Sequence, residues 1–333
     1  MRQALLPLVL AIVLSGCAAA PPAAIQGLPG SFAPALAQAF PLTVGVYATG
    51  DRDRVLLGQP HEEDGSVPVR VGSGFMIDTQ GTVATVAHLL ETATSIAVRL
   101  ADGRVVAAEV IGEDPSTDVA LLRVPAGLRS APVFGRSAAL RAGDWVLAIG
   151  EPFGFNRSVA AGIVGGKDRH FIDDREMMSI QSDIAFNPGN SGGPLLDTSG
   201  AIVGMNQRTI VGPFGTPGVS MSAPIELVLQ IAAELRQGTV VRPRMGALFH
   251  DLMVPQALKV GSSHAHGAVV TGVERGSLGN RIGLRPDDII VAMNGRSITG
   301  AAELARALLA WRKADGTRLV VLRERQYLEL VLP

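Results

Sequence analysis

The stretch NPGNSGGP, residues 187–194, is the most sharply patterned part of the 333-residue chain. Its serine, Ser191, is surrounded by glycine, which lets the backbone turn tightly and leave a hydroxyl exposed. Backbone N–H groups nearby, those of Gly189, Asn190 and Ser191, can then point at one oxygen atom. The stretch therefore predicts a serine nucleophile beside an oxyanion hole, in which the backbone amides of Gly189 and Ser191 are the main donors.

A serine hydroxyl is a weak nucleophile unless a base takes its proton. The histidines that precede Ser191 in the chain are His61, His88 and His170. His61 lies in a polar, acidic segment and His170 in a charged one. His88 follows an apolar segment that ends at Thr85-Val86-Ala87, where a strand can hold it still, so we predict that His88 is the base.

The base needs a carboxylate that fixes its tautomer and stabilises its protonated form. Asp118 comes directly before the apolar segment 119–122, so it can be both desolvated and rigid at the head of a strand. Asp114 is the rival, but its place in the turn Asp-Pro-Ser-Thr, residues 114–117, favours a structural role. Each residue alone has an ordinary structural explanation; the order His, Asp, Ser in one β-rich region favours a catalytic set.

Residues 189–193 also match the G-x-S-x-G elbow of α/β-hydrolases. That elbow leads from a strand into a helix, and its histidine comes last in the chain. Here Pro194 and a turn at 197–200 follow the serine, and the later histidines, His250, His264 and His266, lie in or beside a second folded unit. The esterase interpretation is therefore disfavoured.

Short extended segments separated by turns fill the chain from Thr43 to about Ser222, and Asp102-Gly103 is a strong hairpin signal. Such spacing is typical of a β-sandwich or β-barrel. The expected strands span residues 43–49, 67–77, 95–100, 105–111, 119–124, 145–149, 159–164, 177–184 and 201–206.

A helix is predicted at 225–237, because apolar residues recur at helical spacing between Pro224 and Gly238. A domain boundary is expected at 239–244. The second unit, 245–333, mixes strands at 267–273 and 288–293 and a hairpin at 318–332 with a short helix at 277–282 and an amphipathic helix at 301–311.

Bulk composition excludes several classes of protein. Apolar residues make up 47% and charged residues 18% of the chain, which is typical of a globular protein. The net charge of −1 and the lack of a basic run argue against nucleic acid. Cys17 is the single cysteine, so neither a disulfide framework nor a thiolate metal site is possible. His264 and His266 are interpreted as loop residues, and we expect no metal and no cofactor.

The N-terminus has the pattern of a signal peptide, with Arg2 before an apolar run at 4–14 that is too short for a comfortable membrane span. Leu-Ser-Gly-Cys, residues 14–17, resembles the bacterial lipoprotein box. We therefore expect a signal peptide at 1–16 and a tether at 17–41, lipidated at Cys17. Cleavage after the alanines at 18–20, and an uncleaved anchor, are the alternatives.

Beyond these features, the chain from about residue 40 resembles the HtrA/Deg family of chymotrypsin-fold serine proteases. The matching motifs, in order, lie at 72–75 (GSGF), 85–88 (TVAH), 114–122, 148–154 (AIGEPFG) and 189–195 (GNSGGPL). Two departures are Val86-Ala87, which replaces a polar pair before the histidine, and residues 166–169, which replace the usual loop. The segment that follows, up to about residue 178, is unusually charged.

The resemblance implies a mainly β fold. A chymotrypsin-like double β-barrel protease domain of two six-stranded barrels, 42–238, would be followed by a small α+β PDZ domain, 239–333. Met245, Gly246, Ala247 and Leu248 would bind the carboxylate of a peptide C-terminus, because backbone amides and a sheet edge receive such peptides.

As a member of this family, the protein would be a serine endopeptidase of the bacterial cell envelope, in the periplasm, cleaving unfolded or misfolded proteins after small or medium apolar residues. It would form a homotrimer. Two alternatives stay open: a protease-fold chaperone or binding module without turnover, and a stress sensor that cleaves one regulatory protein.

Overall fold

A computed structural model describes residues 30–50, 69–128, 131–151, 157–169, 178–210, 219–238, 245–259, 261, 266–311 and 316–332. Several predictions fall outside these residues: the signal peptide, Cys17, most of the tether, the boundary at 239–244, and the histidines at 61, 170 and 264. They stay predictions.

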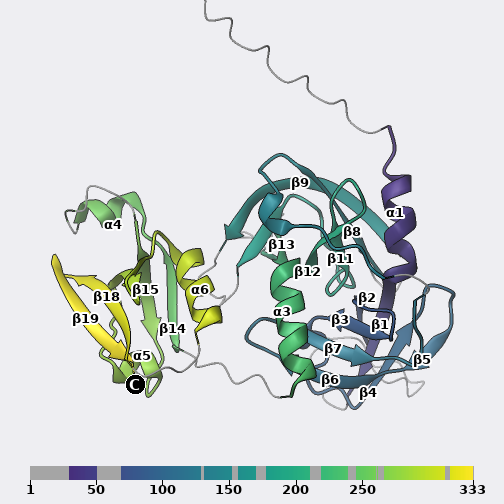
Figure 1. Ribbon diagram of the computed structural model, residues 1–333, viewed down its shortest axis with the longest axis horizontal. Coiled ribbons are helices and arrows are strands. Elements are labelled where there is room, and N and C mark those ends of the chain that lie inside the picture. The colour runs from purple at the N-terminus through teal and green to yellow at the C-terminus, as the bar shows by residue number, and fades with distance from the viewer. Residues whose placement is uncertain are drawn as a thin grey trace, which may run out of the picture. The chain divides into compact units, whose positions relative to one another are not determined.

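The first part of the protease domain is an antiparallel sheet with the strand order β5-β4-β1-β2-β3-β7-β6 (Figure 1). Valine is the commonest residue in its strands, and β-branched residues pack well on a pleated surface. The strands are β1 (Thr43–Thr49), β2 (Val69–Met76), β3 (Thr82–Thr85), β4 (Ser95–Arg99), β5 (Val105–Ala107), β6 (Glu109–Asp114) and β7 (Val119–Arg123).

The single strand expected at 105–111 is two strands in the structure. It breaks at Ala108, whose amide donates to Ile96 O at 3.0 Å, and β5 pairs with β4 while β6 pairs with β7. The two edges of the sheet are thus consecutive in the chain, joined by one bent segment. Where the resemblance implied a six-stranded barrel, the structure has a seven-stranded sheet, because the segment expected to form one strand forms two.

The second part of the protease domain is a closed six-stranded barrel, β10-β13-β12-β11-β8-β9. Its interior is apolar, with Val146, Ile180, Leu195 and Val203 buried in one cluster. The strands are β8 (Trp145–Gly150), β9 (Ser158–Arg169), β10 (Ser179–Ser182), β11 (Pro194–Leu196), β12 (Ile202–Ile210) and β13 (Val219–Pro224).

Helix α3 (Ile225–Arg236) confirms the helix predicted at 225–237. Its apolar side is buried, and it contacts β6 and β7 of the first sheet and β12 and β13 of the barrel (Figure 1). Arg236 in its last turn forms an ion pair with Asp78 at 2.6 Å. The helix therefore fastens the two sheets together from one side.

The segment expected to be a tether up to residue 41 contains structure at its end. Helix α1 (Ala33–Ala39) and the 3₁₀ turn η1 (Phe40–Leu42) precede β1. Ala39 is fully buried, and Thr43 Oγ1 donates to Ala39 O at 3.0 Å. The tether interpretation was wrong for these residues, because a short alanine-rich run gives little periodic signal and is stabilised by packing.

The C-terminal domain has a six-stranded sheet in the order β14-β15-β16-β18-β19, with β17 paired to β16. Helix α6 (Ala301–Ala310) buries Leu304 and Leu308 in its core beside Trp311. The other elements are β14 (Ala247–Asp251), α4 (Val254–Lys259), β15 (Ala268–Val273), α5 (Leu278–Arg281), β16 (Ile289–Met293), β17 (Arg296–Ser297), β18 (Thr317–Arg323) and β19 (Gln326–Leu332). The elements predicted here are present; β14, α4 and β17 were not predicted.

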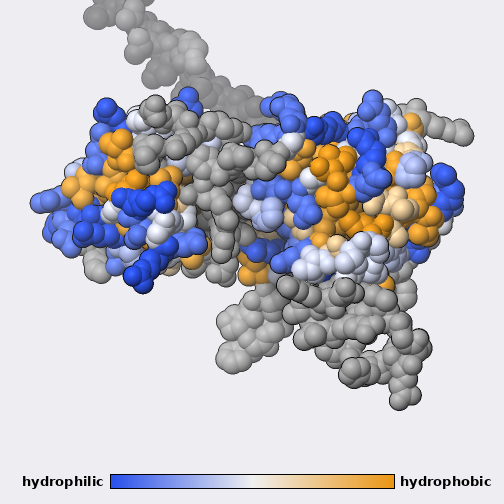
Figure 2. Space-filling view, turned by 90° about the horizontal axis from the view of Figure 1, so that it is seen from below, coloured by the Kyte–Doolittle hydropathy of each residue, from blue (hydrophilic) through white to orange (hydrophobic). Residues whose placement is uncertain are grey.

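The surface mixes hydrophilic and hydrophobic residues. On the protease domain, at the right of Figure 2, hydrophobic side chains gather into a patch surrounded by hydrophilic ones. No helix in the described part of the chain is long and apolar enough to cross a membrane.

Candidate active site

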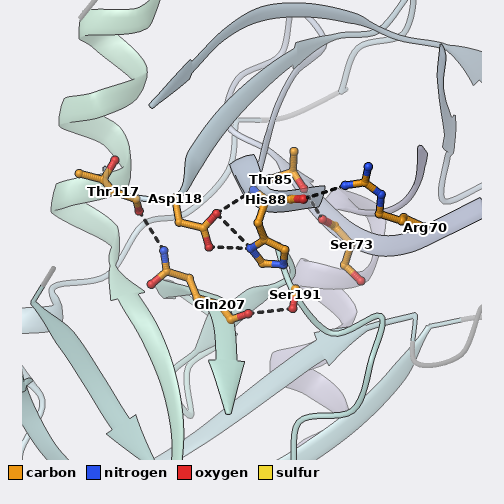
Figure 3. A network of polar contacts seen from close by, with 8 residues as sticks. All are labelled: Arg70, Ser73, Thr85, His88, Thr117, Asp118, Ser191 and Gln207. Carbon is orange, nitrogen blue, oxygen red and sulfur yellow. Dashed lines mark hydrogen bonds and ion pairs between the residues drawn. The ribbon is translucent and has the colours of Figure 1, made fainter. Parts of the chain in front are cut away.

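His88 and Asp118 are joined by hydrogen bonds within the first sheet. His88 lies in the 3₁₀ turn η2 (Ala87–Leu89) after β3, and Asp118 lies in the turn between β6 and β7. His88 Nδ1 is 2.8 Å from Asp118 Oδ2 and 3.0 Å from Oδ1, and the His88 amide donates to Oδ1 at 2.9 Å. The carboxylate thus holds both the ring and the backbone of the histidine (Figure 3).

Asp118 has a φ of +54°, an unfavourable value for a residue with a side chain. The turn before it is held by Asp114, whose carboxylate accepts hydrogen bonds from Ser116 Oγ at 2.5 Å and Thr117 Oγ1 at 2.8 Å. Asp114 is therefore committed to its own turn, as expected for a structural residue.

Ser191 comes from the other barrel, in the loop between β10 and β11. Its Oγ donates to the main-chain oxygen of Gln207 at 2.7 Å. Among the described residues that oxygen is its hydrogen-bond partner, and no hydrogen bond joins Ser191 to His88. Figure 3 shows Ser191 beside the imidazole ring, on the side away from Asp118. Three side chains far apart in the sequence are thus gathered, with two of them joined.

The residues before Ser191 form a tight turn. The Asn190 amide donates to Asn187 O at 3.0 Å, Pro188 follows Asn187, and Gly189 has a φ of +105°. These are the marks of a type II turn, which needs a positive φ at its third residue. Gly189 is suited to that position because it has no Cβ.

This turn corrects the predicted set of oxyanion donors. The Asn190 amide is used inside the turn, and its side chain is buried, so it is not available to a substrate. The amides of Gly189 and Ser191 donate to no acceptor in the part of the chain that the structure describes. The amides of Gly189 and Ser191 are therefore available to an oxyanion, whereas the Asn190 amide between them is occupied.

Ser73 on β2 ties the first sheet to this turn. Its amide donates to Ser191 O at 2.8 Å and its hydroxyl to Gly189 O at 2.6 Å, while the Glu151 amide donates to the Ser73 hydroxyl at 2.9 Å. Gly192 lies against the same strand: a Cβ on it would be 2.0 Å from Ser73 O. The carbonyl oxygen of the Gly189–Asn190 peptide is thus held by Ser73, and its amide is held by Asn187 O.

The Glu151 side chain is buried and forms a small polar cluster across the two barrels. Its Oε2 accepts hydrogen bonds from Arg99 at 2.6 Å and from the Tyr47 hydroxyl at 2.9 Å. Burial, and then the hydrogen bond to Glu151, raise the pKa of Tyr47 to about 12. The hydrogen bond to Glu151 also raises the pKa of Arg99. The cluster joins the end of β8 to β1 and β4.

In the C-terminal domain, the residues predicted to bind a carboxylate lie at the start of β14. Met245 and Gly246 precede the strand, and Ala247 and Leu248 open it. The main-chain oxygens of Met245 and Gly246 accept hydrogen bonds from Gly279 and Glu274, each at 2.8 Å. In the sheet as described, β14 pairs with β15 alone, so its outer edge is open, and α6 contacts it.

Sequence reasoning missed the residues that support the site. Ser73 lay inside a quoted motif, so its position was noticed but not its contacts. Glu151 likewise lay inside the quoted motif at 148–154, and Gln207 gave no local signal; the partners of both come from distant parts of the chain. No group of three or more His, Cys, Asp or Glu side chains within the described ranges could hold a metal ion.

Comparison with known proteins places the chain among serine proteases. Residues 72–205 match the trypsin-like peptidase domain and residues 269–323 the PDZ domain. The chain is 37% identical over 255 residues to a probable periplasmic serine endoprotease DegP-like of Ectopseudomonas mendocina (strain ymp), covering 76% of this chain and 54% of that protein. It is 40% identical over 246 residues to a protein of the same name from Marinomonas sp. (strain MWYL1), covering 74% and 52%. The chain thus spans about half the length of these curated relatives.

Solved structures cover more of the chain. The HtrA-type protease AlgW with tripeptide is 31% identical, covers 91% of this chain and is itself covered to 96%, with a TM-score of 0.71. AlgW with decapeptide gives a TM-score of 0.68 at 30% identity. The trypsin-like domain, the single PDZ domain and this match over nearly the full length of AlgW agree, so the chain belongs to the HtrA family of serine proteases.

Proposed function

We propose that this protein is a serine endopeptidase that cleaves unfolded polypeptides through an acyl-enzyme. Ser191 attacks the peptide carbonyl, and His88 takes its proton and passes it to the leaving amine. Asp118 orients His88 and stabilises its protonated ring. The amides of Gly189 and Ser191 donate to the oxyanion. Water then releases the acyl group, with His88 as the base again.

The observation that carries this proposal is the His88–Asp118 pair with Ser191 beside the free side of the ring. To react, the Ser191 hydroxyl must leave Gln207 O and turn toward His88 Nε2. This exchanges one hydrogen bond for another, so its net cost is small compared with the barrier that the site lowers. Ala185, six residues before Ser191, stands where trypsin-like enzymes carry an aspartate in the substrate pocket, and an uncharged residue there supports a preference for apolar side chains.

The decisive experiment combines a covalent probe with turnover. A fluorophosphonate is expected to form a stoichiometric adduct on Ser191, and Ser191→Ala is expected to lower casein digestion by roughly 10⁶. Ser199→Ala is the matched control, because Ser199 is an exposed serine whose hydroxyl bonds to Asp197 in a surface turn. Casein digestion by Ser191→Ala at the wild-type rate would overturn the assignment. A wild-type protein that binds casein without reacting with the probe would favour the chaperone alternative.

We further propose that the PDZ domain binds peptide C-termini along β14, with the carboxylate near Met245, Gly246, Ala247 and Leu248. The open edge of β14 and the neighbouring helix α6 support this, because a peptide can add a strand there. Amidating the C-terminus of a bound peptide should abolish its binding to the full chain. Equal binding of the free and amidated peptides would contradict the proposal.

The cellular setting is also a proposal. We propose a periplasmic protein, since the curated relatives carry the word periplasmic in their names. We also propose that it is anchored through lipidated Cys17, which the Leu-Ser-Gly-Cys box at 14–17 supports, and that it assembles as a homotrimer, which the family resemblance supports. Mass spectrometry of the mature N-terminus would distinguish a chain that begins with a lipidated Cys17 from one without a lipid. Sedimentation equilibrium would distinguish a trimer from a monomer.

A further inference from the structure

Gln207 is a buried polar residue at the place where the two barrels meet, and the proposed mechanism does not use its side chain. Its exposed fraction is 1%. Its Nε2 donates to the main-chain oxygen of Thr117 at 3.0 Å, and its own main-chain oxygen accepts the Ser191 hydroxyl at 2.7 Å (Figure 3). One residue of β12 therefore contacts both the loop of the predicted carboxylate and the predicted nucleophile.

A β-bulge gives Gln207 this position. In the β12–β13 ladder, Asn206 pairs with Ser222 and Arg208 with Met221, so Gln207 is the extra residue at a register shift. A bulge re-aims the residue that it inserts. Asn206, the residue before Gln207, is fixed to the serine loop, because Gly192 N donates to Asn206 O at 2.7 Å and Asn206 N donates to Gly193 O at 2.8 Å. Gln207 thus extends from a segment already locked to Ser191.

The contact with Thr117 falls on the peptide that sets the conformation of Asp118. The Thr117 carbonyl and the Asp118 amide belong to one planar peptide unit, so fixing that oxygen restrains φ of Asp118. That φ, +54°, is a value which persists only where the surroundings enforce it. The Asp114 turn restrains the preceding residues, and Gln207 restrains this peptide from the opposite barrel.

We propose that Gln207 is a positioning residue for the reaction: it clamps the Thr117–Asp118 peptide to the strand that carries the serine loop. The clamp keeps the Asp118 carboxylate on His88 Nδ1 while the imidazole stays beside Ser191. The inference rests on the proposed function, and it adds a residue to the machinery that supports the His88–Asp118 pair.

Two substitutions remove the hydrogen bond between Gln207 and Thr117 O while changing the side chain in different ways. Gln207→Met keeps the length of the side chain and removes the amide. Gln207→Asn keeps the amide and removes one methylene, so its nitrogen falls short of Thr117 O. The two variants share the loss of this hydrogen bond. Gln230→Met is the matched control, because Gln230 is exposed on α3 and its amide bonds across one helical turn to Glu234.

Both Gln207 variants are expected to lower kcat by about tenfold to a hundredfold, the range for a displaced catalytic group, with KM changed less than about twofold. The low-field NMR signal of the His88 Nδ1 proton, assigned by its loss in His88→Gln, should weaken or move. Fluorophosphonate labelling should slow in parallel, and Gln230→Met should match the wild type in every measurement.

The outcomes separate this inference from the function on which it rests. Folded variants with wild-type kcat, or a fall in kcat with an unchanged His88 Nδ1 signal, would overturn the clamp while leaving the protease proposal intact. If the wild-type protein itself fails to react with the fluorophosphonate, the proposed function fails instead. Should Gln207→Met not fold, the more conservative Gln207→Asn decides.

Discussion

The two halves of the candidate site differ in how completely they are formed. The half on the first sheet, His88 with Asp118, is joined by three hydrogen bonds of 2.8–3.0 Å. The half on the closed barrel, Ser191 with its turn, has the hydroxyl on Gln207 O rather than on the histidine. Contacts between neighbouring strands of one sheet are set by the ladder, whereas contacts between barrels depend on a few buried polar residues. Those residues are where the site is most easily changed.

The largest effect should come from breaking the formed half. Asp118→Asn removes the acceptor that fixes the His88 tautomer, and in the template serine protease this change lowers kcat by about 10⁴. Stopped-flow or peptide-substrate kinetics would measure it. Asp197→Asn, which alters an exposed turn, is the control and should keep wild-type kcat. Wild-type activity in Asp118→Asn would show that the joined pair is not part of the mechanism.

The next effect concerns the polar cluster that spans the barrels. Arg99→Met leaves the Glu151 carboxylate buried without its cation, and it should lower the free energy of unfolding by about 2–3 kcal/mol. This loss is below the usual range for breaking a buried ion pair, because a quarter of the Arg99 side chain is exposed. Urea denaturation would measure the loss. Arg141→Met, which breaks an exposed pair with Asp144, should change stability far less. Equal losses in the two variants would mean that the cluster adds nothing.

A smaller effect is expected from loosening the second half. Ser73→Ala removes the hydroxyl that joins the Glu151 amide to Gly189 O, so the turn is held at one end only. Because losing an oxyanion donor outright costs about 10²–10³, we expect an indirect loss of about tenfold in kcat with KM little changed. Affinity for a peptide boronate should fall in proportion. Ser137→Ala, a buried serine that bonds to Glu226 outside the site, is the control. A higher KM at constant kcat would point to substrate binding instead.

The smallest effect is a titration. In a Tyr327→Phe background, Tyr47 is the remaining tyrosine, and its absorbance should change near pH 12. Because folding raises its pKa above the ordinary value of 10.0, the stabilising contribution is complete below about pH 10 and is lost as the pH rises through 12. Glu151→Gln should move the titration to lower pH. An unchanged titration in that variant would leave burial as the sole cause.

Sequence reasoning reached far into this protein where the signals are local. The strand at 43–49, the Asp102-Gly103 hairpin and the helix at 225–236 follow from alternation, turn residues and helical spacing. Glycine and proline at 188–189 mark a turn that only a few residue types can form. Asn190 was wrongly included among the donors, because hydrogen bonds inside a turn depend on its type, which residue names alone do not fix.

The sequence by itself therefore predicted the side chains of the proposed chemistry, His88, Asp118 and Ser191, and the class of fold that holds them. Only the tertiary structure decided what supports them: Ser73 on the oxyanion turn, Glu151 between the barrels, and Gln207 on the Thr117–Asp118 peptide. The physical reason is distance along the chain. Propensity, turn chemistry and periodicity act over a few neighbouring residues, while these hydrogen bonds join residues that folding alone brings together.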